Sequence, residues 1–166
     1  FITTSPNDFG AFFTGKNTNL LIVSKNTTTK SSTALHELNH GYFELLAHHL
    51  NTSDTTFSKA SAKLYDEAKT TLRSKLNTIL KKIKEEKKLS VDEARFYKVV
   101  LEYVDRFYDA TTLHKKISSG EIVSSNDVIS KLYGFSSFTE FLAEGFSSLQ
   151  FIDLLSQLPD RKSTRL

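Results

Sequence analysis

Apolar side chains recur at intervals of three and four along most of this chain, and that spacing predicts helices. Between residues 33 and 50 they form one stripe of an amphipathic helix, made up of Leu35, Leu38, Tyr42, Leu45 and Leu46. The polar positions of the same stretch hold most of the histidines of the chain. We therefore predict a helix over 33–50 that presents histidines beside an apolar stripe.

The helical spacing returns in the longer segments that follow. An amphipathic segment covers 55–88, and "SVDE" at 90–93 matches a capping box, so a new helix is predicted to run from there to about Gly120. Together these segments form a helical insertion over 55–118. After a short helix and the turn "YGFSS", a last amphipathic helix is predicted over 137–158.

The N-terminal region has a different pattern. The segment "FGAFFTGKNTNLLIVS" reads as two short apolar strands around the turn residues "TGKNTN", so residues 1–30 are predicted to carry strands. The predicted fold class is therefore α+β, mostly helical, with a small N-terminal β-sheet. The length fits a single domain over 1–166.

Composition and charge narrow the choice of partners. A net charge of +3 is too small to favour nucleic acid, and the lysine-rich run at 81–88 mixes both signs. No stretch approaches the about 18 apolar residues of a membrane span, and no signal segment is evident, so we expect a soluble protein without predicting its compartment. The chain has no cysteine, which excludes disulfides and thiolate metal sites. It starts without methionine and ends on a polar stretch, as expected of a domain cut from a longer protein.

The stretch "HELNH" has the H-E-x-x-H pattern of a zinc-binding helix. Residues four apart lie about 40° apart around a helix axis, so His36 and His40 can hold one zinc ion between them. Glu37 is rotated by about 100° and can reach a water on the metal, which is the position of a general base. The alternative is a surface helix that tolerates histidine freely, as His48 and His49 indicate.

A catalytic zinc ion needs a third protein ligand. The extended motif H-E-x-x-H-x-x-G-x-x-H is excluded, because Phe43 and Leu46 stand at its glycine and last histidine positions. His114 lies beside two lysines and fits a solvated helix end better than a ligand position.

Two glutamates of the last helix are better candidates for the third ligand. Glu140 and Glu144 are four apart in the largely apolar "FTEFLAEGF", where a carboxylate is costly to bury unless it is paired or bound to a metal. Glu140 also completes a capping box that starts at Ser137, which explains a glutamate there without any metal. The two explanations are compatible, since the first turn of the helix can also point into a cleft.

Taken together, "HELNH" and the later "YGFSSFTEFLAEGF" resemble the catalytic domains of the anthrax toxin lethal factor family, zinc metallopeptidases of the gluzincin type. In that family the zinc-binding glutamate begins a Glu-Phe-Phe-Ala-Glu-Ala-Phe stretch and follows a Tyr-Gly pair. Here Tyr133 and Gly134 form such a pair, with the tyrosine seven residues before Glu140. The resemblance is confined to these two blocks. Related domains occur in bacterial toxins and in phage-encoded polyproteins.

The resemblance implies a zincin-like domain with an active-site helix and a glutamate helix. Three residues would bind one zinc ion: His36, His40 and Glu140. Glu37 would act as the general base, Tyr133 would hydrogen-bond the oxyanion, and Glu144 would support a ligand histidine. The edge strand that pairs with an extended substrate would contain Leu20, Leu21, Ile22 and Val23.

These residues predict a zinc-dependent endopeptidase with a peptide or protein substrate, whose specificity and oligomeric state the sequence does not predict. Two positions depart from the common pattern. Asn39 stands where the family often has glycine, and Gly41 lies inside the helix, where glycine costs about 1 kcal/mol relative to alanine. Two alternatives remain: a catalytically inactive zincin-like binding module, and a metal-free helical interaction domain built around residues 55–118.

Overall fold

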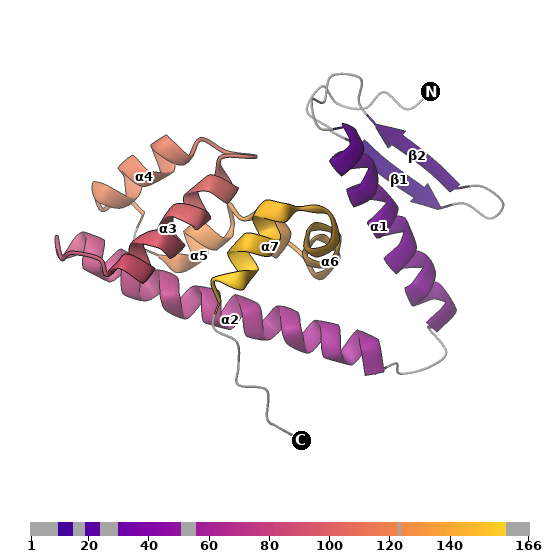
Figure 1. The fold of residues 1–166 in the computed structure, drawn as a ribbon, viewed down its shortest axis with the longest axis horizontal. Coiled ribbons are helices and arrows are strands. Elements are labelled where there is room, and N and C mark those ends of the chain that lie inside the picture. The colour runs from indigo at the N-terminus through magenta and orange to yellow at the C-terminus, as the bar shows by residue number, and fades with distance from the viewer. Residues whose placement is uncertain (1–9, 15–18, 24–29, 51–55, 123, 159–166) are drawn as a thin grey trace.

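A computed structural model describes residues 10–14, 19–23, 30–50, 56–122 and 124–158 of the chain. Most of the described residues lie in helices, which confirms the predicted mostly helical class (Figure 1). Within these ranges no helix combines the length and the apolar character needed to cross a lipid bilayer.

The described N-terminal residues form two strands, β1 (Gly10–Thr14) and β2 (Asn19–Val23). They pair antiparallel, with Gly10 opposite Val23 and Thr14 opposite Asn19. The hairpin lies along helix α1 (Lys30–Leu50), as Figure 1 shows. The predicted turn falls mainly on residues 15–18, which lie outside the described residues.

Helix α1 does not use its apolar stripe as its main packing face. Leu35, Leu38 and Tyr42 are 45%, 48% and 60% exposed. The helix instead turns its histidine face toward helix α6 (Phe138–Ser147), because the carboxylates of α6 need polar partners when they are covered. For these three residues, the apolar stripe therefore did not indicate the face of α1 that packs on α6. The side chains of its other two members, Leu45 and Leu46, lie outside the described residues.

The predicted 55–118 insertion consists of α2 (Thr56–Lys84), α3 (Val91–Val104) and α4 (Ala110–Ser118). The capping box is confirmed, since the Ser90 side chain accepts from the Glu93 backbone and the Glu93 side chain accepts from Ser90. The prediction of one unbroken helix from there to Gly120 is wrong. Asp109 starts a separate helix, because its side chain accepts the free Thr112 N–H.

The C-terminal part contains α5 (Ser125–Ile129), a 3₁₀ turn η1 (Tyr133–Phe135), α6 and α7 (Leu149–Ser156). The prediction of one helix over 137–158 is wrong, because Ser148 adopts an extended conformation between α6 and α7. Its hydroxyl accepts from Phe151 N–H and so caps α7.

The hydrophobic core lies among α2, α3, α4, α5, η1, α6 and α7. Its largest fully buried side chains include Tyr103, Phe135, Phe151, Leu72 and Leu76. Figure 1 shows α6 between this core and α1. One face of α6 therefore completes the core, while its first turn meets the histidines of α1.

Candidate metal centre

Helix α1 brings its two motif histidines to one point. His36 and His40 are one turn apart, and their Nε2 atoms lie 3.0 Å from each other. His36 is buried and His40 is half-buried. Asn39, between them, donates from Nδ2 to the carbonyl of Ala143 at 3.5 Å and so holds this face of α1 on α6.

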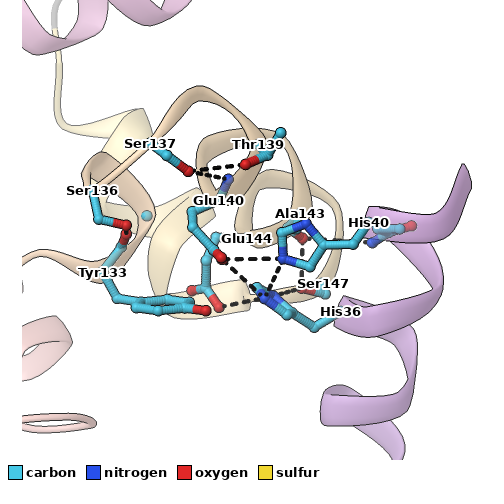
Figure 2. A network of polar contacts seen from close by, with 12 residues as sticks. His36, His40, Tyr133, Ser136, Ser137, Thr139, Glu140, Ala143, Glu144 and Ser147 are labelled. Carbon is cyan, nitrogen blue, oxygen red and sulfur yellow. Dashed lines mark hydrogen bonds and ion pairs between the residues drawn. The ribbon is translucent and has the colours of Figure 1, made fainter. Parts of the chain in front are cut away.

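Glu140 meets both histidines from the first turn of α6. Its Oε2 atom lies 3.1 Å from His36 Nε2 and 3.2 Å from His40 Nε2 (Figure 2). Its backbone N–H donates to the Ser137 hydroxyl, which starts the helix. Only one bond of the predicted capping box forms here: the Ser137 hydroxyl accepts the Glu140 backbone N–H, while the Glu140 side chain faces the histidines instead of the Ser137 backbone. The cap therefore does not explain a glutamate side chain at this position.

The three side chains, which we call the metal group, can hold one ion. Their ligand atoms all lie within 4.8 Å of one another. The sides of the triangle, 3.0, 3.1 and 3.2 Å, compare with about 3.3 Å between ligands bound to a tetrahedral zinc ion at about 2.0–2.1 Å. Two imidazoles and one carboxylate are donors that zinc accepts, and three protein ligands leave a fourth position open. The donor set therefore fits a catalytic zinc site.

Charges within the metal group stabilise one another. Burial of His36 opposes its positive charge, but hydrogen bonds to Glu140 and Glu144 favour it more strongly, and the pKa rises to about 9. Burial of Glu140 likewise opposes its charge, but hydrogen bonds from His36 and His40 lower its pKa to about 2. Glu140 is thus an anion at neutral pH, ready to pair with a cation.

The second carboxylate of α6 lies behind His36. Glu144 is buried, and its Oε1 atom is 3.3 Å from His36 Nδ1. Its Oε2 atom accepts from the Tyr103 hydroxyl at 2.8 Å and from Arg106 Nη1 at 2.9 Å. Burial raises its pKa, but the contacts with His36, Arg106 and Tyr103 outweigh burial and lower it overall. Glu144 is therefore an ionised carboxylate that can orient His36.

Tyr133 is the first residue of η1, and its side chain points into the same site (Figure 2). Its ring lies 5.7 Å from the His36 ring and 4.9 Å from the Phe107 ring, between centroids. Burial raises the pKa of its phenol, and the charge of Glu140 and a hydrogen bond to it raise the pKa further. The hydroxyl is therefore a neutral donor across the physiological pH range.

Glu37 is half-buried, and its carboxylate interacts electrostatically with His36, His40 and Glu140. Burial raises its pKa, the electrostatic influence of His36 and His40 lowers it, and the charge of Glu140 raises it, with a net increase. A carboxylate with a raised pKa is a stronger base than one in free solution. Its charge also acts on Tyr133, so the side chain belongs to the same cluster.

The remaining sequence candidates lie elsewhere. His114 is exposed on α4, and its Nδ1 atom is 3.1 Å from the Tyr97 hydroxyl, away from the metal group. The backbone of Leu20, Leu21, Ile22 and Val23 forms β2, but their side chains lie outside the described residues, as do those of His48 and His49.

Sequence reasoning missed the partners that other helices supply. Tyr103 and Arg106 contact Glu144, and the Ser147 hydroxyl lies 3.4 Å from His36 Nδ1. A glutamate at position 144 of a largely apolar helix indicates that its carboxylate needs a polar or charged partner. The sequence does not indicate which helix supplies that partner.

Comparison with protein-family models, with curated proteins and with solved structures finds no match for this chain. The geometry of the site places two histidines, three glutamates and a tyrosine in one cluster between α1 and η1–α6.

Proposed function

We propose that the chain is a zinc-dependent endopeptidase of the gluzincin type. The convergence of His36, His40 and Glu140 carries the proposal, since residues a hundred positions apart present three zinc-preferring atoms to one point. The residue types around this point also fit peptide hydrolysis: a carboxylate base in Glu37 and a neutral phenol donor in Tyr133.

A zinc ion held there would supply a Lewis acid and lower the pKa of a bound water to about 7. Glu37 would take the proton of the attacking water and pass it to the leaving amine of the peptide. Its raised pKa suits both transfers, because the same carboxylate must accept a proton and then release it.

Tyr133 would donate a hydrogen bond to the oxyanion that forms on the scissile carbonyl. Contact with the Phe107 ring restrains the Tyr133 ring, so its hydroxyl is held near the site before substrate arrives. Loss of a single oxyanion donor costs about 10²–10³ in kcat in a serine protease, and we expect a comparable loss for Tyr133→Phe.

An extended peptide would bind by strand addition, with main-chain hydrogen bonds to the hairpin. Among the described residues β2 pairs only with β1, so we propose its second edge, along Leu20 to Val23, as the substrate strand. Main-chain pairing of this kind recognises extended chains, which favours an endopeptidase over an enzyme for small molecules.

The test is the digestion of a peptide library by protein as purified, by protein treated with chelator, and by the same protein after zinc is added back. Wild-type protein purified without chelator is expected to bind about one zinc ion per chain and to cleave some peptides, with new ends read by mass spectrometry. Chelator should abolish cleavage, and added zinc should restore it. His36→Gln should lose zinc and cleavage, whereas the exposed His114→Gln should retain both.

The same experiment separates the alternatives. Zinc binding without cleavage of any peptide would favour an inactive zincin-like binding module. No bound metal, and no rise in melting temperature on adding zinc, would favour a metal-free helical interaction domain.

A further inference from the structure

The carboxylate of Glu144 divides its two oxygens between two sets of partners. Oε1 lies 3.3 Å from His36 Nδ1. Oε2 accepts from Tyr103 at 2.8 Å and from Arg106 at 2.9 Å. A carboxylate held on one side by two donors cannot rotate freely, so its other oxygen stays aimed at the histidine.

Tyr103 makes a second contact that Arg106 does not make. Its hydroxyl accepts the backbone N–H of Gly134 at 2.9 Å, and Gly134 follows Tyr133 directly in η1. Tyr103 is fully buried, so water does not substitute for either partner. One hydroxyl therefore touches both the carboxylate behind His36 and the turn that carries Tyr133.

Arg106 contacts the site from just beyond the end of α3. Besides Glu144, its Nη1 atom makes a close hydrogen bond with the hydroxyl of Ser148, the residue that separates α6 from α7. Its guanidinium also lies over the Phe107 ring, 4.9 Å from the ring centroid. The cation is thus fixed beside Glu144, and it reaches the Tyr133 turn only indirectly, through the Phe107 ring that packs on Tyr133.

We propose that Tyr103 and Arg106 are positioning residues of the metal centre, which assigns a role to the α2–α4 insertion. Tyr103 aligns Glu144 with His36 and fixes the turn of Tyr133, whereas Arg106 fixes Glu144 and the α6–α7 junction. This inference rests on the proposed function, because it concerns the supports of the zinc ligand His36 and of the oxyanion donor Tyr133.

The test compares Tyr103→Phe and Arg106→Gln with two matched changes on α3. Tyr97→Phe removes another buried tyrosine hydroxyl, one bonded to His114, and Arg95→Gln removes an exposed arginine. Zinc affinity is measured by competition with a chromogenic chelator, and kcat is measured at saturating zinc. Circular dichroism of the metal-free proteins reports folding.

Tyr103→Phe is expected to weaken zinc binding by about tenfold, the lower end for loss of a group that supports a ligand. It should also lower kcat at saturating zinc, because the Tyr133 turn loses its anchor. Arg106→Gln should weaken zinc binding by a similar factor and lower kcat less than Tyr103→Phe does. Tyr97→Phe and Arg95→Gln should match wild type in zinc affinity.

A double-mutant cycle distinguishes positioning from a general structural role. If Tyr103 acts on zinc through Glu144, Tyr103→Phe should add little to the loss of zinc affinity already caused by Glu144→Gln. Additive losses, or a zinc affinity equal to that of Tyr97→Phe, would overturn the proposal. Should Tyr103→Phe not fold, the same cycle with Arg106→Gln decides the matter. Wild type that binds no zinc would contradict the proposed function itself.

Discussion

Glu140 uses its backbone and its side chain for different tasks. The backbone N–H completes the cap of α6 at Ser137, while the carboxylate faces His36 and His40. The cap fixes where the helix begins, and so it also fixes how far the carboxylate reaches toward α1. The cap uses only the backbone N–H of Glu140, so the carboxylate is free to face the two histidines.

Also at the scale of residues, the raised pKa of His36 predicts how the stability of the metal-free protein depends on pH. Its pKa is about 9 in the folded chain against 6.5 ordinarily, so folding is favoured by its protonated form. That stabilisation is complete below about pH 6.5 and is lost as the pH rises through about 9. Melting temperatures of chelator-treated wild type should therefore fall more between pH 6 and pH 10 than those of His36→Gln. Parallel decline of the two proteins would contradict the assignment.

At the scale of elements, the turn η1 depends on one glycine. A Cβ atom on Gly134 would lie 2.5 Å from the Phe151 side chain, and that ring is fully buried. The turn can approach the core this closely only because Gly134 has no side chain. The same close approach determines how near the neighbouring Tyr133 lies to the core.

Two glycine variants test this packing. Gly134→Ala should destabilise the protein by about 1–3 kcal/mol, because the added methyl group overpacks the core. Gly145→Ala is the matched control: its Cβ would meet nothing within 4 Å, and alanine in α6 should add up to about 1 kcal/mol of stability. Thermal unfolding measures both, and a Gly134→Ala protein as stable as wild type would refute the close approach.

The sequence predicted the features whose signals are local, and it missed those that depend on contacts between distant parts of the chain. The capping box at Ser90 and the H-E-x-x-H spacing are local signals, and the structure shows the capping box and brings His36 and His40 to one point. The breaks at residues 105–109 and at Ser148 were missed, because Asp109 and Ser148 are ordinary polar residues until a backbone N–H lies free beside them. Tyr103 and Arg106 were missed for the same kind of reason, since their contacts depend on how α3 packs.

At the scale of the whole molecule, the metal group joins two parts. The hairpin and α1 lie on one side of α6, and the helical core lies on the other (Figure 1). Among the described side chains of the junction between α1 and α6, Phe43 and Phe146 pack with their ring centroids 5.4 Å apart. The polar contacts of this junction are concentrated at the metal group, so a bound ion would cross-link the two parts.

Hydrogen exchange should detect that cross-link. Adding zinc to chelator-treated protein should slow amide exchange in α1 and in the first turn of α6, because an ion bound to both restricts their separation. Amides of α2 near Leu76, inside the core, should change little. His36→Gln is the control and should show no zinc effect. Equal slowing in α2 and α1 would contradict a local cross-link.

The most direct measurement of the central claim compares zinc-loaded wild type with Glu37→Gln on one peptide that wild type cleaves. Zinc content and turnover are determined on the same samples. Glu37 is not a member of the metal group, so the variant should keep about one zinc ion per chain and lose nearly all turnover. A Glu37→Gln protein that cleaves at the wild-type rate would contradict the account, and so would a wild type that binds no zinc.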